Sequence, residues 1–156
     1  MAVRGAVKIP VVGAGMATYH LAYQLASKFA VISVSKDLNS VFLRAIKQAE
    51  CYERMTSMRS IGKPLKLPME DFYTPEELEK ELIKIAKVQV EDEGAQLIVV
   101  ACTFISLLLA PGGMERLAKN LGVIFVDPQE IAVKTAEMLV NMGLSHSKIE
   151  YPQIKP

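Results

Sequence analysis

Short apolar runs alternate along this chain with longer segments of helical periodicity, and this alternation is the feature that most constrains its fold. The runs are rich in β-branched residues and predict strands at 8–12, 29–34, 96–101 and 123–126. A further short run predicts a strand near 58–61. Strands that are separated by helices are joined by right-handed crossovers, which leave them parallel. We therefore expect an α/β fold with a mostly parallel sheet and helices on both faces.

Capping signals delimit the helices between these runs. Thr74-Pro75-Glu76-Glu77 is a capping box with proline at the first helical position, and Asp127-Pro128 marks a second start, with Asp127 as the cap. The stripe that we expect the first of these helices to bury is Leu78, Leu82, Ile85 and Ala86. Further helices are predicted at 16–27, from Asp37 or Asn39 to about Glu50, and at 114–121. Gly94, Gly122 and Gly143 end three of the helices, and the tail 144–156 is expected on the surface.

Length and charge exclude several classes of partner. The 156 residues suggest one domain, and 18 basic against 17 acidic residues give no electrostatic support for nucleic-acid or membrane-surface binding. The apolar stretches are too short to cross a membrane, and the N-terminus has no signal-peptide pattern. Two cysteines form neither a disulfide framework nor a metal quartet. We expect a cytoplasmic protein with a small-molecule or protein partner, no nucleic acid, no membrane and no metal.

Cys102 closes the apolar run 96–103, where a buried strand gives way to a loop. Ligands of open α/β sheets bind outside the carboxyl ends of the strands, and a thiol there can act as a base or a nucleophile. Cys51 follows a helix in an irregular stretch, so we expect a packing residue there. His20 lies in a predicted helix beside apolar neighbours and is expected to be a satisfied histidine, not a general base. Cys102 is thus the candidate catalytic residue.

Two parts of the chain match each other at an offset of 127 − 13 = 114 residues. Residues 9–25 align with residues 123–139, so that Val12 meets Val126 and Ala22 meets Ala136. The match describes either two generic strand-turn-helix units or an internal duplication. For a duplication, the counterpart of Cys102 falls at 102 − 114 = −12, before Met1. The chain then corresponds to one half of a duplicated fold, preceded by the last strand and helix of the other half.

Five segments carry a resemblance to a known family. They are Ile9-Pro-Val-Val-Gly-Ala-Gly15 with His20-Leu-Ala, Phe29-Ala-Val-Ile-Ser-Val-Ser35, the stretch from Glu93 to Thr103, Leu121-Gly-Val-Ile-Phe-Val-Asp-Pro128, and residues 132–148. The Cys-Thr and Val-Asp-Pro elements, in this order and at this spacing, resemble the hydantoin and allantoin racemases of the aspartate/glutamate racemase superfamily. The resemblance covers most of the chain.

The resemblance implies one lobe of a two-lobe, pseudo-symmetric racemase fold. Residues 1–28 would be the last strand and helix of an otherwise missing N-terminal lobe. Residues 29–143 would form the C-terminal α/β lobe that carries Cys102, and residues 144–156 an irregular tail. We accordingly expect a homo-oligomer or a complementing lobe as the protein partner.

The activity that the resemblance implies is racemisation that needs no cofactor and, in particular, no pyridoxal phosphate. A proton leaves and returns at a carbon next to a carbonyl, in a hydantoin, allantoin or amino-acid-type substrate, and the enolate that develops needs preorganised donors. Cys102 would be one of two thiol acid/bases, the other being absent from this chain. Thr103 would offer its hydroxyl and N–H to the substrate, Ser33 and Ser35 their hydroxyls, and Gly13 a close approach of its loop.

Three departures from the family pattern affect what carries over. The upstream lobe, with the strand that bears the first cysteine, does not precede residue 1 in this sequence. Met16 stands where the family has an acidic residue soon after the glycine turn, and Phe104-Ile105 stands where Gly-Met is usual. Phe104 and Ile105 make the loop after Cys102 bulkier than Gly-Met does, and a narrower pocket is the expected result.

Two alternative functions remain open at this stage. The chain could be a catalytically inactive, truncated racemase homologue that acts as an interaction or binding module, with an exposed half of a two-lobe interface. A lesser alternative is a nicotinamide-dinucleotide-binding domain, because Gly13-Ala14-Gly15 and Asp37 are spaced like part of the dinucleotide fingerprint. Thr18 replaces the third glycine of that fingerprint.

Overall fold

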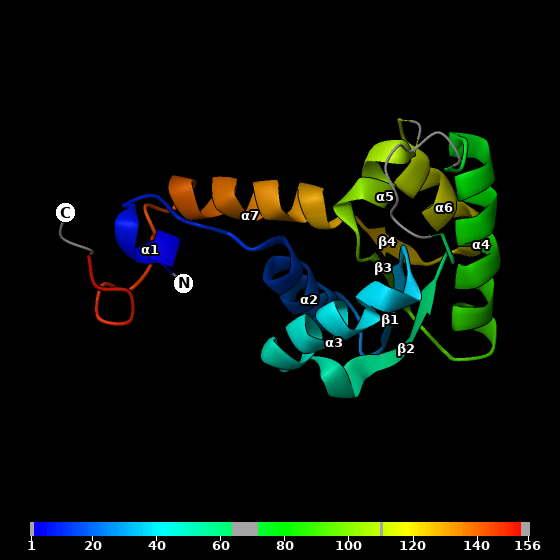
Figure 1. Cartoon of the computed structure of the whole chain (residues 1–156), viewed down its shortest axis with the longest axis horizontal. Coiled ribbons are helices and arrows are strands. Elements are labelled where there is room, and N and C mark those ends of the chain that lie inside the picture. The colour runs from blue at the N-terminus through cyan, green and yellow to red at the C-terminus, as the bar shows by residue number, and fades with distance from the viewer. Residues whose placement is uncertain (1, 64–71, 110, 154–156) are drawn as a thin grey trace.

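A four-stranded parallel sheet forms the centre of the computed structural model, which describes residues 2–63, 72–109 and 111–153 (Figure 1). The strands are β1 (Phe29–Ser33), β2 (Met55–Ser60), β3 (Leu97–Val100) and β4 (Ile124–Val126). The helices are α1 (Ala2–Ala6), α2 (Ala14–Leu25), α3 (Asn39–Gln48), α4 (Pro75–Glu91), α5 (Thr103–Leu108), α6 (Gly113–Leu121) and α7 (Pro128–Asn141), with 3-10 turns at Lys36–Leu38 and Tyr52–Arg54. The expected α/β class, with a parallel sheet and helices on both faces, is confirmed.

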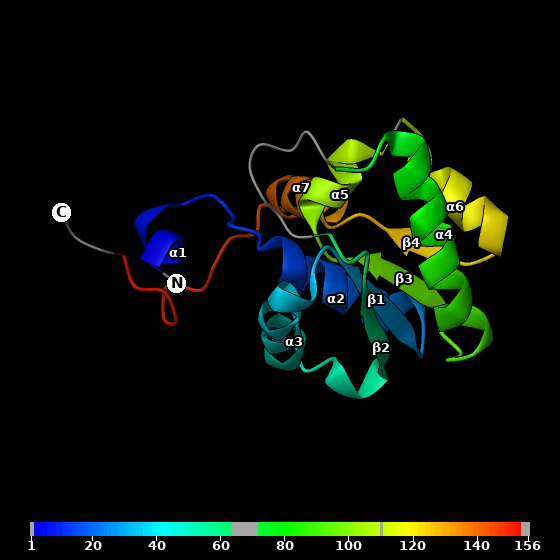
Figure 2. The same ribbon diagram turned by 45° about the vertical axis from the view of Figure 1, so that its right-hand side comes forward.

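The two central strands, β1 and β3, are buried on both faces. Ala30 and Ile98 point into one core cluster with α4 and α6, whereas Val31 and Val99 point into the other with α2 and α3. Figure 2 shows the sheet between these two helical layers. Because neither face meets water, both strands read as uninterrupted apolar runs rather than as alternating ones.

The strand order β2-β1-β3-β4 places a topological switch point between β1 and β3. The connection from β1 to β2 runs one way across α3, and the connections from β2 to β3 and from β3 to β4 run the other way across α4 and α6. Right-handed crossovers in opposite directions require helices on opposite faces. The loops that leave β1 and β3 therefore diverge at the carboxyl edge of the sheet, the place where open α/β sheets bind ligands.

The predicted caps are present at the two longest helices. Thr74 accepts a hydrogen bond from the Glu77 N–H, and the Glu77 carboxylate accepts one from the Thr74 N–H at 2.9 Å. Asp127 accepts a hydrogen bond from the Gln129 N–H at 2.8 Å. The predicted buried stripe of α4 is confirmed, and Gln89 continues it one turn further. Gly94 and Gly122 adopt positive φ, as a glycine that ends a helix commonly does.

One predicted strand is wrong. Residues 8–12 do not enter the sheet, because their hydrogen bonds go to the C-terminal tail. The Val11 N–H donates to the His146 ring at 2.7 Å, and the Ser145 hydroxyl donates to the Lys8 carbonyl at 2.7 Å. The short helices α1 and α5 were not predicted from the sequence, since five or six residues give too little periodicity to detect.

Residues 2–13 and 143–153 lie side by side and project from the body of the molecule; we refer to them together as the arm (Figures 1 and 2). Polar contacts hold its two segments together, among them Lys148 to the Val7 carbonyl at 2.9 Å and Arg4 to the Tyr151 hydroxyl at 3.0 Å. The apolar side chains of the arm are largely exposed, and Ile9 is 67% accessible. Polar contacts thus join the two segments of the arm, whose described residues form no hydrophobic core.

Candidate functional site

Cys102 lies at the carboxyl edge of the sheet, two residues beyond the end of β3. The Ala101 N–H donates to the Ile32 carbonyl at 2.9 Å, so the chain still runs beside β1 just before the thiol. The Cys102 carbonyl accepts from the Ile105 N–H at 3.0 Å and begins α5. The Cys102 side chain is half-buried and forms no disulfide. The residue therefore lies at the switch point, the place where open α/β sheets bind their ligands.

The first turn of α5 follows directly on this thiol. Thr103 is the first residue of the helix and is exposed, so its hydroxyl is accessible at the same edge. Ser106 lies one turn further along the helix, and its hydroxyl oxygen is buried without a hydrogen-bond partner among the described residues. Sequence reasoning missed Ser106, because a lone serine in an apolar segment carries no signal for a site.

The hydroxyl of Ser33, at the end of β1, is buried and engaged within the protein. It donates to the Asn39 side-chain oxygen at 2.5 Å and lies 3.4 Å from the Ser35 and Arg59 carbonyls. Asn39 begins α3, so this contact ties the end of β1 to the helix that follows it. Sequence analysis did not find Asn39 as a partner of Ser33.

Ser35 caps the 3-10 turn that follows β1. Its hydroxyl oxygen accepts a hydrogen bond from the Asp37 N–H at 3.2 Å and lies 3.3 Å from the Asp37 carboxylate. Both Ser33 and Ser35 are thus at the predicted edge of the sheet, and both hydroxyls hold the loop after β1 in shape.

Gly13 precedes α2, whose N-terminus belongs to the same edge because α2 runs back toward the start of β1. Its carbonyl accepts the first hydrogen bond of the helix, from the Ala17 N–H at 3.0 Å. No heavy atom of the described residues outside its immediate neighbours lies within 4 Å of where a Cβ at Gly13 would be, and the approach of this loop to a substrate stays a prediction. At Gly15 the nearest atoms to such a Cβ belong to the Tyr19 ring at 3.5 Å and to Ala45 at 4.0 Å, which are ordinary van der Waals contacts.

The geometry also disfavours the nicotinamide alternative. A dinucleotide fingerprint needs a strand directly before its glycines, and residues 8–12 form none. Asp37, the proposed ribose ligand, is exposed in a 3-10 turn, and its N–H donates to the Ser35 hydroxyl oxygen.

Cys51 and Asp127 have structural roles. Cys51 is buried, and its thiol donates to the Ala49 carbonyl at 3.1 Å, which confirms it as a packing residue. Burial raises the pKa of the Cys51 thiol above its ordinary value. His20 is exposed on α2. Asp127 is a helix cap, as predicted.

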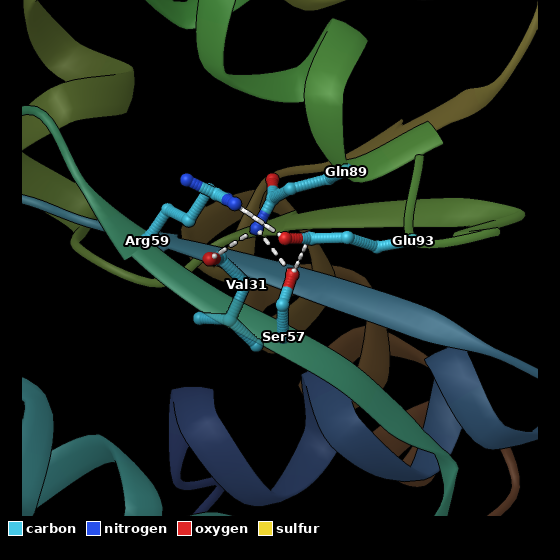
Figure 3. A network of polar contacts seen from close by, with 5 residues as sticks. All are labelled: Val31, Ser57, Arg59, Gln89 and Glu93. Atoms are coloured by element: carbon cyan, nitrogen blue, oxygen red, sulfur yellow. Dashed lines mark hydrogen bonds and ion pairs between the residues drawn. The ribbon is translucent and has the colours of Figure 1, made fainter. Parts of the chain in front are cut away.

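A polar network that sequence analysis did not find joins β2 to α4 (Figure 3). The Gln89 side-chain amide donates to the Val31 carbonyl at 3.0 Å and to the Ser57 hydroxyl at 3.2 Å. Ser57 in turn donates to the Glu93 carboxylate, which also accepts from Arg59. The Arg59 hydrogen bond holds the pKa of Glu93 below its usual value. One sequence signal could have indicated this network: Gln89 lies on the face of α4 that the apolar periodicity assigns to the core.

A pocket of about 420 Å³ lies beside this network, along the free edge of β2, and Lys36, Asn39, Arg59 and Glu93 are among its lining residues. Among its lining residues Arg59 and Glu93 form an ion pair, so these two charges neutralise each other. Across the described residues, no group of three or more His, Cys, Asp or Glu side chains is placed to hold a metal ion. Nor does any helix in the described part of the chain have the length and apolar character to cross a membrane.

Comparison with protein families gives one match that covers most of the chain. The family model for Asp/Glu/Hydantoin racemase matches residues 1–136. A hydantoin racemase from Paenarthrobacter aurescens is 30% identical over 140 residues, covering 89% of this chain and 56% of that protein. A hydantoin racemase from Rhizobium meliloti is 29% identical over 157 residues, covering 99% of this chain and 62% of that protein. The chain thus spans somewhat more than half the length of these relatives.

The fold matches solved structures over nearly its whole length. The allantoin racemase from Pseudomonas fluorescens superposes with a TM-score of 0.82 and 26% identity, over 99% of this chain and 63% of that one. A glutamate racemase from Bacillus anthracis shares the fold more distantly, with a TM-score of 0.53 and 18% identity. Because the first match covers 99% of the chain, it includes the arm as well as the sheet.

Proposed function

Because the chain belongs to the Asp/Glu/Hydantoin racemase family, we propose that it carries one half of a cofactor-independent racemase site built on Cys102. The substrate class is a hydantoin, allantoin or a related compound with a hydrogen on a carbon next to a carbonyl. The observation that carries the proposal is the position of Cys102, a half-buried thiol at the switch point of a parallel sheet in a chain of this family.

The proposed reaction consists of two proton transfers at one carbon, in which one C–H bond breaks and a new one forms on the opposite face. The Cys102 thiolate takes the proton from the substrate carbon, and the electron pair of the broken C–H bond moves into the carbonyl as an enolate. A proton donated to the opposite face of that carbon re-forms the C–H bond and consumes the enolate. Because a thiol is a much stronger acid than the C–H group, the site must stabilise the enolate with preorganised donors.

Neighbours of Cys102 have distinct roles in this scheme. The exposed Thr103 is suited to donate its hydroxyl to a substrate oxygen. Ser33 and Ser35 act on the substrate through the loop after β1, because their hydroxyls are engaged with Asn39 and Asp37. Of the side chains that the sequence suggests for substrate contact, this leaves Thr103, together with backbone groups of these loops.

The arm supports the proposal that a second lobe completes the site. Its exposed apolar side chains include Val3, Ile9, Leu144 and Ile149, and the exposed end of α7 adds Val140 and Met142. Isolated apolar residues are common on surfaces, but several of them on one projecting element favour a contact surface. In this scheme residues 1–28 continue the chain of that second lobe, and residues 29–143 form the lobe of Cys102, against whose sheet Tyr19 and Ala22 of α2 pack. Residues 144–156 are the tail. The second acid/base comes from the lobe that covers the arm.

Deuterium exchange at the reacting carbon tests the proposal. The chain is incubated with 5-methylhydantoin or allantoin in deuterated water, and loss of the C–H signal is followed by NMR for each enantiomer. One thiol serves one face, so we expect exchange above the buffer rate for one enantiomer without inversion.

The two cysteines supply a matched pair of variants. Cys102→Ser should abolish the exchange, and Cys51→Ser, in which the buried hydroxyl can still donate to the Ala49 carbonyl, should retain it. Exchange that persists in the Cys102→Ser variant contradicts the role of this thiol. If the wild-type chain gives no exchange with any of these substrates, the enzymatic proposal fails for the chain by itself.

The same arm favours a second candidate function, that of an interaction module without activity. A chain of this kind would self-associate or bind a complementing lobe through the arm. Sedimentation velocity separates the cases: Ile9→Glu and Met142→Glu together should shift an assembly toward monomer, because both side chains are exposed and apolar. Assembly that resists both substitutions contradicts a docking role for the arm.

A further inference from the structure

Strand β2 is an edge strand with room along its outer side. Among the described strands it pairs with β1 alone, at one end of the order β2-β1-β3-β4. The pocket of about 420 Å³ is lined by four consecutive residues of this strand, 57–60. Successive side chains of a strand point to opposite faces of the sheet, so a hollow that touches all four runs along the edge itself.

The backbone groups that face this hollow belong to Met58 and Ser60. The Ile61 N–H donates to the Ser33 carbonyl at 3.0 Å, which turns the backbone groups of Ile61 toward β1. Because these groups alternate in direction along a strand, those of Arg59 also face β1, and those of Met58 and Ser60 face outward. Outward N–H and C=O groups on an edge strand are a template for a further strand.

The side chains beside this edge, on the side of α4, carry charges of both signs. The Glu93 carboxylate, just beyond α4, accepts hydrogen bonds from Ser57 and Arg59 of β2 (Figure 3). The Arg59 side chain is 45% exposed and that of Glu93 is 23% exposed. Both charges thus keep accessible surface for a second partner of opposite sign.

The edge is complementary to itself when a second copy of β2 lies antiparallel to it. In a register centred on Met58, the two Met58 residues exchange both of their backbone hydrogen bonds, and Arg59 lies opposite Ser57 of the second copy. Opposite side chains of such a pair are about 4.5–5.5 Å apart, and Ser57 is bonded to Glu93. Arg59 of each copy is thereby brought beside Glu93 of the other, so that charges of opposite sign alternate across the two-fold axis.

A parallel arrangement of the two edges lacks this complementarity. It requires a two-fold axis along the strand, which turns the α4 side of one copy to the opposite face of the joint sheet. Arg59 of one copy and Glu93 of the other are then separated by the sheet. The distribution of charge therefore favours the antiparallel pair.

We propose that β2 binds β2 of a second copy in antiparallel register about Met58, and that the resulting two-fold dimer has one sheet running through both copies. Arg59 and Glu93 select this register. The surface is separate from the arm, and β1 lies between it and the strand that leads to Cys102. The inference therefore does not depend on the proposed racemase site.

Sedimentation velocity of the full chain over about a hundredfold range of concentration tests the proposal. All proteins carry Ile9→Glu and Met142→Glu, so that association through the arm does not contribute, and we expect an equilibrium between monomer and dimer. Met58→Pro removes an N–H that faces outward and is not used by β1, and edge strands tolerate such a proline. We expect the dissociation constant to rise about tenfold or more, because two backbone hydrogen bonds are lost, while the circular dichroism spectrum stays unchanged.

A mixing experiment tests the alternation of charges. Arg59→Glu leaves two carboxylates at this site and Glu93→Arg leaves two cations, so each variant alone should be monomeric. Their equimolar mixture should dimerise, because opposite charges then meet across the axis although like charges still repel within each chain. Arg116→Glu is the matched control, since Arg116 forms a comparably exposed ion pair with Glu79, and it should dimerise like the parent chain.

Each outcome decides for or against the β2 dimer. A parent chain that is monomeric at every concentration shows that Arg59 protects the edge from pairing, and it overturns the proposal. A dimer that Met58→Pro leaves intact also overturns it, because another surface then holds the copies together. If Met58→Pro does not fold, the mixing experiment decides: a mixture that stays monomeric contradicts the proposed register. None of these results bears on the exchange assay with Cys102.

Discussion

The sheet body and the arm of this molecule both contain apolar side chains, but only the body buries them in a core. Every residue of β1 and β3 is buried, and helices cover both faces. In the arm Ile9 is 67% exposed and Leu144 is 49% exposed. Helix α7 leads from the body to the arm, with Ile131 near its start in the core and Val140 near its end exposed.

The difference shows what apolar residues need in order to stabilise a fold. In the body each side chain has neighbours from a strand and from a helix, so burial and dispersion contacts accumulate. In the arm the ties between the two segments are hydrogen bonds and ring contacts, such as His146 to the Val11 N–H. Hydrogen bonds that water can replace add little net stability. The arm is therefore the part of the molecule whose structure depends most on a partner.

The largest expected effect comes from a matched pair of truncations, one in each region. Ile98→Ala, in the buried centre of β3, should lower the free energy of unfolding by about 2–5 kcal/mol, because it removes core contacts and leaves a cavity. Ile9→Ala, in the exposed arm, should change it by less than about 0.5 kcal/mol. Urea unfolding followed by circular dichroism measures both. Similar losses for the two variants would mean that the arm is already packed in solution.

The next effect concerns the polar network that fastens β2 to the body. Gln89→Ala should cost about 1–3 kcal/mol, because the Ser57 hydroxyl and the Val31 carbonyl lose a buried donor. Gln24→Ala, an exposed glutamine on α2, is the control and should be nearly neutral. A Gln89→Ala chain as stable as wild type would show that the edge strand does not depend on this network.

A smaller effect should appear in the pH dependence of stability. The hydrogen bond from Arg59 lowers the pKa of Glu93, so its contribution is fully present above the unfolded carboxyl pKa of about 4.3 and is lost as the pH falls through the lower folded value. Arg59→Met should make the decline in unfolding free energy below pH 4.3 shallower. Urea titrations between pH 3 and pH 7 test this, and parallel curves for the two proteins would contradict it.

The smallest effect on global stability is expected from the arm itself. His146→Ala removes the acceptor of the Val11 N–H, and it should speed hydrogen exchange at that amide while the midpoint of unfolding stays unchanged. Amides of β1 and β3 should exchange only through global unfolding in both proteins. Should the substitution lower the unfolding midpoint instead, the arm and the body would be one cooperative unit.

Much of the body could be predicted from the sequence, because local signals and burial agree there. The capping residues Thr74 and Asp127 both make the predicted contacts, and the run that becomes β3 is buried on both faces as its composition indicated. Residues 8–12 have the same kind of run and form no strand. A strand needs neighbours that satisfy its hydrogen bonds, and composition does not reveal whether those neighbours exist.

The candidate site shows the same division. The order of strands and helices was enough to place Cys102, Thr103, Ser33 and Ser35 at one edge of the sheet. It was not enough to show that the Ser33 hydroxyl is held by Asn39, or that Phe104 meets Phe72. These pairs come from different loops, and the sequence separation between Phe72 and Phe104 leaves no periodic signal.

By itself, then, the sequence determined the fold class, the helix boundaries marked by caps, the family and the position of Cys102 after a buried strand. Each of these depends on local spacing or on a motif that is contiguous in the chain. The packing of the folded chain sets which hydroxyls are engaged and which apolar residues have no core to enter. Those properties depend on which distant segments come into contact, and such contacts are set by the packing of the whole sheet and its helices.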